Sequence, residues 1–429
     1  MSDTSTASPT AATAHDAVTC MFCGLHCDDL TVRAVARKLT PVRLSCDKAV
    51  AGYAGLSIND TPRIKGRAVT RDEALSAAAK LLREARRPLL GGLSTDVNGM
   101  RAAVRFAERF DGALEHLHAG ATRRSLQVLQ QRGWHTTTLG EVHNRADLVI
   151  LVGAEVERAF PRFISRHLAG RHALQAERRK ARRLVYLGPA AQAPTETSGL
   201  PTQRIAVPAS ALAETVRLLQ GLVMGAHAPA PRGQRGAALQ ALATEIRAAE
   251  YPVFVWAAGQ LDPATGDLLI AAVCDLVSQI NRTRRAAGLA LGGDDGAQTA
   301  MAAMGWLTGF GNGVGFTRGE LNPRITDGAD AVTLLLRGDA DLLLFINSFS
   351  RREPPKGPWP SIVLAPPGMT PVADADVYLP TGIPGVDHAG QIIRADGVVA
   401  LPLRALREAT HPSVAETLEA LSVACEGKS

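Results

Sequence analysis

Four cysteines near the N-terminus have the residue type and spacing to bind a metal. Three of them lie within eight residues as C-x2-C-x3-C, and the fourth follows much later; they are Cys20, Cys23, Cys27 and Cys46. Structural zinc sites usually take their ligands as two separated pairs. A group of three plus a distant fourth suits a cubane cluster better. The spacing therefore predicts ligation, with a [4Fe–4S] cluster as the first candidate and zinc or an empty site as the alternatives.

The compartment supports this interpretation of the cysteines. The N-terminal stretch "MSDTSTASPTAATAHDA" has no charged region followed by an apolar one, so an export signal is not indicated and we expect a cytoplasmic protein. In that reducing compartment a disulfide framework is not expected. The two other cysteines, Cys274 and Cys425, lie in an apolar and a terminal segment, and we expect them to pack as small apolar side chains.

Composition excludes several classes of protein. The 429 residues are 46% hydrophobic and 21% charged, which is typical of a globular protein with two or more domains. Apolar runs are too short to cross a bilayer, so no membrane segment is expected. The net charge is +6, and arginine-rich runs such as "ERRKARR" (177–183) form either a solvated helix face or a docking surface for an acidic partner. With 4% aromatic residues and no recognised module, nucleic-acid binding is not expected.

Apolar strands alternate with amphipathic helices along most of the chain. Strands are expected in "PLLGG", "ADLVILVG", "RRLVYLG" and "PVFVWAAG", and helices in "GMRAAVRFAERF" and "ATGDLLIAAVCDLVSQI". Thr70 and Glu73 have the spacing of a capping box at the start of a further helix. This alternation predicts an α/β fold with doubly wound, mostly parallel sheets. Ligands in such folds bind beyond the carboxyl ends of the strands.

The same pattern gives domain boundaries. We expect a disordered tail at 1–16, a small cysteine-rich subdomain at 17–62, an α/β domain at 63–225, a linker at 226–236 and a second α/β domain at 237–429.

Several blocks of sequence resemble one known family. The segments "CMFCGLHCDDL" and "CDKA" are similar to the cluster-binding region of the B subunit of formylmethanofuran dehydrogenase, in the molybdopterin oxidoreductase superfamily. Further similar blocks follow in the family's order and extend the resemblance over nearly the whole chain. They are "VTRDEAL", "LGEVHNRADLVILVG", "TGFGNGVGFTRG", "GDADLLLFINS" and "ADVYLPTGIPGVDHAGQIIRADGV".

The resemblance implies roles for individual residues. The four cysteines match the family's cluster ligands, and Lys48 corresponds to a lysine between cluster and pterin. Segments that line the bis-pterin dinucleotide in the family match those containing Thr308, Gly309, Arg318, Asn347, Ser348, Gly390 and Arg394. The residues alone favour one of these segments, because "GDADLLLFINS" is an apolar strand ending in small polar residues, where a nucleotide or pterin phosphate can bind.

One departure from the family concerns the metal ligand. In the dehydrogenases a cysteine binds tungsten or molybdenum directly, but the interval "ALEHLHAGATRRSLQVLQQRGWHTTT" contains none, and the best-matching position is Ala121. His116 and His118 lie in the same interval and could bind a metal. An imidazole reproduces neither the charge nor the softness of a thiolate, so the alternative is that both histidines pack beside a vacated cavity.

This departure resembles a branch of the family in methylotrophic bacteria. There a relative of the B subunit belongs to a formyltransferase/hydrolase complex, which transfers a formyl group from tetrahydromethanopterin to a furan coenzyme and hydrolyses it to formate without redox chemistry. The resemblance implies three kinds of partner, namely an amidohydrolase-like subunit, a formyltransferase subunit and a further small subunit, with the furan coenzyme held by the complex. We therefore expect a non-redox structural subunit without a tungsten or molybdenum pterin, because that chemistry needs a tuned metal.

Two other functions remain open on the sequence. One is a redox-active B subunit of formylmethanofuran dehydrogenase that carries a tungsten or molybdenum pterin and a [4Fe–4S] cluster. The other is an interaction module whose four cysteines bind zinc only to fold the N-terminal region.

Overall fold

The computed structural model describes residues 12–169, 182–225, 233–326, 328–369 and 375–427. The chain divides into two compact units, each described by itself. Unit 1 consists of 1–117, 294–393 and 400–429, and unit 2 of 118–293 and 394–399. The predicted α/β domains at 63–225 and 237–429 differ from these units, because the chain leaves unit 1, builds unit 2 and returns.

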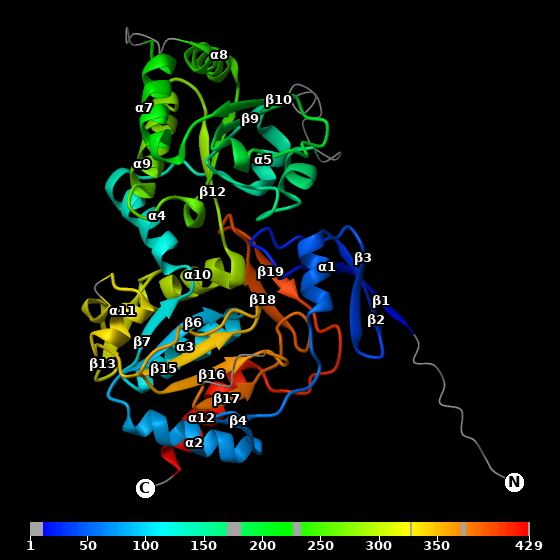
Figure 1. Ribbon diagram of the computed structural model, residues 1–429, viewed down its shortest axis with the longest axis vertical. Coiled ribbons are helices and arrows are strands. Elements are labelled where there is room, and N and C mark those ends of the chain that lie inside the picture. Colours follow the sequence, from blue (N-terminus) through cyan, green and yellow to red (C-terminus); the bar gives the residue numbers. More distant parts are fainter. Residues whose placement is uncertain (1–11, 170–181, 226–232, 327, 370–374, 428–429) are drawn as a thin grey trace, which may run out of the picture. The chain divides into compact units, whose positions relative to one another are not determined.

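Unit 1 is built on a nine-stranded sheet (Figure 1). Its five central strands are parallel, in the order β7 (Ala113–His116), β6 (Pro88–Ser94), β15 (Leu342–Asn347), β16 (Ser361–Ala365) and β17 (Val377–Pro380). An antiparallel hairpin closes each edge: β13 (Val314–Thr317) with β14 (Glu320–Asn322), and β4 (Arg63–Ile64) with β5 (Arg67–Ala68). The order reverses at β6, because β7 pairs on one side of it and β15 on the other.

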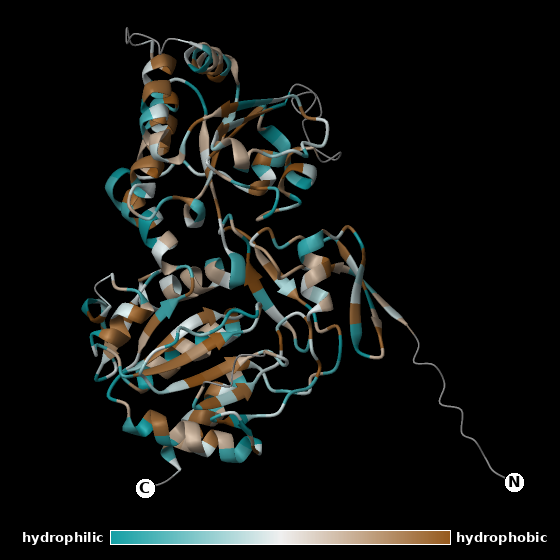
Figure 2. Ribbon diagram, viewed as in Figure 1, coloured by the Kyte–Doolittle hydropathy of each residue, from teal (hydrophilic) through white to brown (hydrophobic). Residues whose placement is uncertain are grey.

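Helices cover both faces of this sheet. Four of them share one core with Leu344: α2 (Arg71–Glu84), α3 (Val97–Arg109), α10 (Ala297–Thr308) and α12 (Val414–Glu426). Leu343 and Phe345 point to the other face, where α11 (Ala331–Leu336) packs. The central strands are accordingly hydrophobic along their length (Figure 2). The predicted capping box is confirmed, since the Thr70 side chain accepts from the Glu73 amide and the Glu73 carboxylate accepts from the Thr70 amide.

The N-terminal region of unit 1 is a three-stranded antiparallel sheet followed by a helix. Its elements are β1 (Thr13–Val18), β2 (Leu30–Val35), β3 (Lys38–Arg43) and α1 (Asp47–Ala54). The prediction of a disordered tail at 1–16 is wrong for 13–16, which pair with β2; residues 1–11 lie outside the described residues. The cysteine-rich region groups with unit 1 and does not form a separate compact unit.

Unit 2 contains a five-stranded, fully parallel sheet. The order is β10 (Thr202–Ala206), β9 (Arg183–Gly188), β8 (Leu148–Val152), β11 (Pro252–Ala257) and β12 (Ala287–Leu291). Its core includes residues of α4 (Ala119–Arg132), α7 (Leu212–Val223), α8 (Gln234–Ala248) and α9 (Gly266–Ile280). The α/β fold with largely parallel sheets is therefore confirmed. Since α7 and α8 both belong to unit 2, the predicted linker 226–236 does not join the two units; its residues 226–232 lie outside the described part of the chain.

Further regular elements of the described residues include a hairpin, a short α-helix and a π-helical turn. Strands β18 (Gly390–Ile393) and β19 (Ala400–Leu403) pair antiparallel in unit 1. In unit 2, α5 (Leu139–Arg145) precedes β8, and a π-helical turn spans Phe163–Leu168. No helix within the described ranges has the length and apolar character needed to cross a membrane.

A fully buried arginine joins α5 to the π-helical turn. The guanidinium of Arg182, with no exposed surface, donates hydrogen bonds to carbonyl oxygens of both elements. Its acceptors are Val142 at 3.1 Å, His143 at 2.9 Å, Ala146 at 2.6 Å, His167 at 3.4 Å and Leu168. The Val142 carbonyl also accepts from the Ala146 amide at 3.3 Å. Helix ends leave most of their last carbonyls without partners inside the helix, so Arg182 satisfies groups that burial would otherwise penalise.

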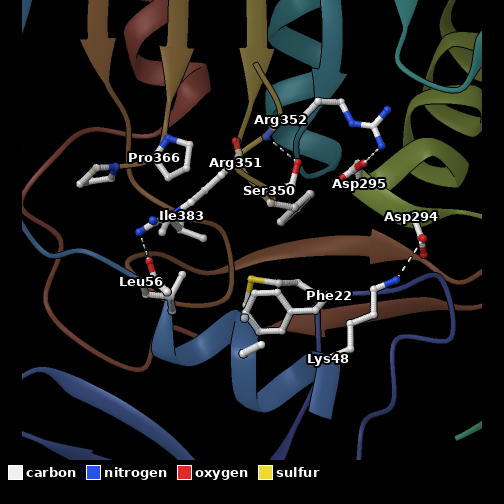
Figure 3. A pocket seen from close by; sticks show the side chains of 17 residues that line it. Phe22, Lys48, Leu56, Asp294, Asp295, Ser350, Arg351, Arg352, Pro366 and Ile383 are labelled. Atoms are coloured by element: carbon white, nitrogen blue, oxygen red, sulfur yellow. Dashed lines mark hydrogen bonds and ion pairs between the residues drawn. The ribbon is translucent and has the colours of Figure 1, made fainter. Parts of the chain in front are cut away.

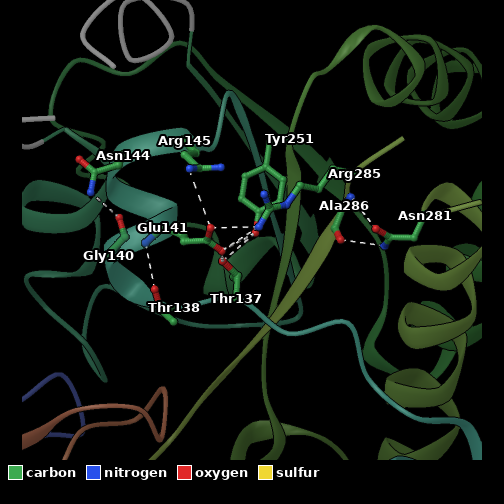
Figure 4. Close-up of polar contacts among 10 residues, drawn as sticks. All are labelled: Thr137, Thr138, Gly140, Glu141, Asn144, Arg145, Tyr251, Asn281, Arg285 and Ala286. Atoms are coloured by element: carbon green, nitrogen blue, oxygen red, sulfur yellow. Dashed lines mark hydrogen bonds and ion pairs between the residues drawn. The ribbon is translucent and has the colours of Figure 1, made fainter. Parts of the chain in front are cut away.

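A second polar network lies where β11 and β12 begin. The Tyr251 hydroxyl donates to Thr137 at 2.8 Å and to the Glu141 carboxylate at 3.2 Å, and Arg285 donates to Glu141 at 3.0 Å (Figure 4). The Arg285 guanidinium also lies 4.9 Å from the centre of the Tyr251 ring. These contacts fix α5 at the amino ends of the strands, away from the edge where ligands bind in parallel sheets, so a structural role explains them.

The buried His167 should make folding sensitive to pH. Burial, together with the charge of Arg166, holds the pKa of His167 well below its ordinary value of 6.5. Below pH 6.5 His167 binds a proton in the unfolded chain but not in the folded state, and this favours unfolding. The free energy of unfolding is therefore highest above pH 6.5 and decreases on acidification. We expect the free energy of unfolding, measured with denaturant from pH 7.5 to 5.5, to decrease less steeply in His167→Gln than in the wild type. The exposed control His135→Gln should keep the wild-type slope; equal slopes in all three would contradict the prediction.

Candidate functional site

The cysteine loop lies between β1 and β2. Its ends are closed by the Cys20 amide, which donates to the Cys27 carbonyl at 2.7 Å, and the His26 amide donates to the Cys23 carbonyl at 3.0 Å. Cys20, Cys23 and Cys27 are buried, and Cys46 is half-buried at the start of α1. Burial raises the pKa of the Cys23 thiol to about 12. The Cys23 thiol is therefore protonated at neutral pH, whereas ligation requires a thiolate.

The four thiols lie in one neighbourhood but are not arranged as ligands. Besides burial, Cys23, Cys27 and Cys46 all raise the pKa of Cys20, which places them close to it. Within the described ranges, no three His, Cys, Asp or Glu side chains are positioned to hold a metal ion. The donor chemistry suits iron–sulfur or zinc, while the side-chain geometry does not. The [4Fe–4S] cluster and its zinc alternative stay predictions.

A cavity of about 410 Å³ opens beside this loop within unit 1. Its walls include Ser348 and Phe349, which follow β15, and Pro366 and Ile383, which follow β16 and β17. It thus lies beyond the carboxyl ends of parallel strands, next to the point where the strand order reverses, which is where doubly wound sheets bind ligands. The volume is within the roughly 300–1,000 Å³ typical of small-molecule pockets.

Two ion pairs line one side of the cavity (Figure 3). The Lys48 ammonium lies 3.1 Å from the Asp294 carboxylate, and Arg352 lies 3.6 Å from that of Asp295. The Gly24 amide donates to the other oxygen of Asp294 at 2.9 Å. Asp294 therefore connects the cysteine loop and α1 to the segment that precedes α10.

A tight turn holds the two carboxylates in place. Asp295 and Gly296 both adopt positive φ, of 55° and 70°. A Cβ at Gly296 would lie 3.2 Å from the Thr95 carbonyl and 3.0 Å from the Phe349 ring. Only glycine fits this approach without displacing its neighbours, so the sequence "DDG" fixes the carboxylates beside the ends of β6 and β15.

The structure places two of the predicted pterin-site residues at the carboxyl end of β15: Asn347 is its last residue and Ser348 follows it. Asn347 is fully buried and organises its own loop: its amide donates to the Arg352 carbonyl at 3.1 Å and its oxygen accepts from the Phe349 and Ser350 amides. Ser348 lines the cavity, as does Lys48. These are the predicted residues that the structure brings together there.

The other predicted pterin-site residues lie elsewhere. Thr308 caps the end of α10 through the Met304 carbonyl, and Gly309 follows with φ of 81°. Arg318 is exposed in the β13–β14 turn.

The last two predicted residues lie in and after β18. Gly390 begins β18, where a Cβ would lie 2.5 Å from the Asp96 carboxylate. Arg394 belongs to unit 2 and pairs with Asp396 at 2.6 Å. Their roles at a pterin stay predictions.

The cavity residues do not fit a pterin dinucleotide. A pyrophosphate carries more than one negative charge and needs several cations that can approach it. Of the three cations that line the cavity, Lys48 and Arg352 already pair with carboxylates, which leaves Arg351. Two carboxylates beside a pyrophosphate would repel it.

The interval that lacks the metal-binding cysteine crosses the boundary between the units. His116 ends β7 in unit 1 and is buried, whereas His118 precedes α4 in unit 2. Ala121 lies in the first turn of α4 and packs against the core of unit 2. An alanine side chain offers no donor atom, so α4 provides no thiolate at this position.

Sequence reasoning missed several residues of the cavity. Asp294 and Asp295 were not proposed, nor were Phe22 and Arg351. Two sequence signals could have indicated them. One is the "DDG" turn directly before the helix that begins at 297, and the other is the "FSRR" segment directly after an apolar strand, where such sheets bind ligands.

Comparison with known proteins now identifies what the chain is similar to. No family model matches it. It is 26% identical over 402 residues to the B subunit of tungsten-containing formylmethanofuran dehydrogenase 2 from Methanocaldococcus jannaschii, covering 89% of this chain and 91% of that protein. It is 29% identical over 343 residues to the B subunit of the formyltransferase/hydrolase complex Fhc from Methylorubrum extorquens, covering 77% and 87%. The resemblance to the B subunit of formylmethanofuran dehydrogenase is confirmed.

Solved structures agree with this result. A chain of the Methylorubrum extorquens formyltransferase/hydrolase complex FhcABCD, solved with methylofuran, superposes with a TM-score of 0.72 at 25% identity, covering 86% of the present chain and 99% of its own. Acetylene hydratase from Pelobacter acetylenicus superposes with a TM-score of 0.60 at 10% identity, covering 96% and 69%. The second likeness concerns the fold alone.

Proposed function

We propose that this chain is a non-redox structural subunit of a formyltransferase/hydrolase complex in tetrahydromethanopterin-linked one-carbon metabolism, in which a formyl group is released as formate. The observation that carries the proposal is the match to a chain of FhcABCD over 99% of that chain's length. The likeness to the B subunit of the Fhc complex supports it independently at the level of sequence. The chain would retain a molybdopterin-oxidoreductase-like fold as a scaffold.

The redox alternative conflicts with the residues of the chain. Oxidation of a formylated coenzyme requires a metal whose ligands orient and tune it. The position expected to supply the thiolate is Ala121, and the chain has no cysteine between Cys46 and Cys274. Two of the three cations that line the cavity in unit 1, Lys48 and Arg352, are paired with Asp294 and Asp295. We therefore propose that electron transfer was lost while the fold was kept.

Exposed apolar side chains support assembly with other subunits. At the end of α10, Trp306 is 65% exposed, and Leu307 and Phe310 are 47% and 40% exposed. Large apolar residues clustered on a surface mark interaction sites more often than free surface. We propose an amidohydrolase-like subunit, a formyltransferase subunit and a further small subunit as partners in the cytoplasm, with the furan coenzyme held by the complex.

Elemental analysis tests the proposal against the redox alternative. We expect the purified chain, alone and in its complex, to contain no stoichiometric tungsten or molybdenum and to reduce no dye with a formylated furan substrate. The complex should hydrolyse that substrate to formate. Stoichiometric tungsten or molybdenum together with dye reduction would overturn the proposal. Iron, sulfide and zinc measured on the same sample decide among a [4Fe–4S] cluster, zinc and an empty cysteine site.

A co-purification test addresses assembly directly. We expect affinity-tagged chain co-expressed with the partner subunits to purify with them in fixed ratio. Trp306→Glu should weaken this co-purification about tenfold or more, because a buried tryptophan often contributes more than 2 kcal/mol to an interface. Leu268→Glu, at a residue 50% exposed on α9, is the matched control in unit 2. A well-behaved chain that binds none of the partners would contradict the proposed function.

A further inference from the structure

The cavity in unit 1 has its own ligand chemistry, which does not depend on the proposed function. We propose that it binds a small monoanion: a flat, apolar body bearing a single carboxylate. Three features carry this assignment, namely the apolar floor, the distribution of charge around the rim and a buried hydroxyl without a hydrogen-bond partner.

The floor of the cavity is apolar and firmly held. The Phe22 ring lies against Gly52 of α1, where a Cβ would come within 2.4 Å of the ring. The Phe22 and Tyr53 rings meet edge-on, with their centroids 5.0 Å apart. Met21 and Ile383 add further apolar surface. A fixed aromatic ring favours a flat ligand, since stacked or edge-on rings attract each other beyond the effect of burial.

The charge around the rim is unevenly distributed. On one side Lys48 pairs with Asp294 and Arg352 with Asp295, so these four groups sum to no net charge. On the opposite side the Arg351 guanidinium donates to the Gly55 carbonyl (Figure 3). Among the described residues no carboxylate forms an ion pair with Arg351. The cavity therefore offers one uncompensated positive charge, which matches one negative charge on a ligand.

A buried hydroxyl points to a polar atom on the ligand. Ser348 is 2% exposed, lines the cavity, and its Oγ has no hydrogen-bond partner in the described part of the chain. Its backbone is fixed, because the Ser348 amide donates to the Ser94 carbonyl at 2.7 Å. A buried hydroxyl without a partner is destabilising, and a ligand oxygen that accepts from it would remove this cost.

The same carboxylates select against more highly charged ligands. A pyrophosphate or nucleoside diphosphate placed in the cavity would approach Asp294 and Asp295, and breaking their ion pairs would be needed to free the cations. Asp295 is the more buried of the two, with 11% of its side chain exposed, so its repulsion is less screened by water. Asp294 and Asp295 thus act as specificity-determining residues.

Isothermal titration calorimetry of the full chain tests the proposal with 2-naphthoate as the probe. Neutral 2-naphthalenemethanol, pyrophosphate and guanosine diphosphate are the comparison compounds. We expect 2-naphthoate to bind at least about tenfold more tightly than each of them, because a charge-assisted hydrogen bond contributes about 1.5–3 kcal/mol. Arg351→Met and Ser348→Ala should each weaken naphthoate binding, the first about tenfold or more, while the exposed Arg337→Met should leave it unchanged.

A second pair of substitutions tests selectivity. Asp294→Asn combined with Asp295→Asn should raise the affinity for pyrophosphate about tenfold or more, since two repulsive charges are removed. No naphthoate binding by the wild type, binding unaffected by Arg351→Met, or tighter binding of guanosine diphosphate by the wild type would each overturn the proposal. These assays use the chain without partners, so their failure is distinguishable from failure of the proposed function.

Discussion

Replacing Arg182 by leucine should lower the free energy of unfolding by about 3–5 kcal/mol, the cost of breaking a buried charged network. The leucine fills part of the space but leaves carbonyl oxygens of α5 and of the π-helical turn without donors in the interior. Each unsatisfied buried group costs about 1–3 kcal/mol, so the loss is large even if water reaches some of them. Denaturant unfolding followed by circular dichroism measures the effect.

The neighbouring residue provides a matched control. Arg183 is exposed and pairs at the surface with Glu245 at 3.2 Å. Arg183→Leu removes the same charge and should cost less than about 1 kcal/mol, because exposed ion pairs contribute little. Equal effects of the two substitutions would show that Arg182 does not have the structural role assigned to it. Arg182→Lys should fall between them, since one ammonium cannot reach all the acceptors.

Arg407→Met should destabilise unit 1 by about 3–5 kcal/mol, because it strands a buried carboxylate. The Arg407 guanidinium lies 2.6 Å from Asp387, and each side chain is only 3% exposed. Arg407 also donates to the Ser57 carbonyl at 2.7 Å, and Asp387 accepts from the Ile383 amide at 2.9 Å. The pair thus fixes the loop that carries Ile383 to the cavity.

A double-mutant comparison separates the stranded charge from lost packing. Asp387→Asn combined with Arg407→Met removes the unpaired carboxylate, so it should be more stable than Arg407→Met alone. The exposed Arg404→Met is the control for loss of a positive charge nearby. If the double variant is less stable than Arg407→Met by the full cost of Asp387→Asn alone, the two side chains act independently and the prediction fails.

Local features of the fold could be predicted from the sequence. The capping box at Thr70, the apolar strand 342–347 and the helix 97–109 depend on neighbouring residues, and periodicity and capping detect such elements. Strand β1 was missed because "TAHDAV" is polar and five of its six residues are not buried, so it lacks the alternation that marks a strand.

Long-range features could not be predicted in this way. Strand β6 pairs with β15, far away in the sequence, and nothing local in either strand specifies that partner. For the same reason the sequence predicted two α/β domains that follow one another along the chain. In the structure the segments of unit 1 lie on both sides of unit 2 in the sequence. The cavity shows the same limit: the sequence singled out Lys48 but not its partner Asp294, because only folding brings the two charges to 3.1 Å.

The divided course of unit 1 affects how the protein emerges from the ribosome. When Gly293 has been synthesised, nearly all of unit 2 is available to fold, whereas β6 still lacks its neighbour β15 and β7 still lacks its neighbour β13. Apolar strand edges left open during translation are prone to aggregate. We therefore expect the nascent chain to need chaperone protection of β6 and β7 until β15 has been synthesised.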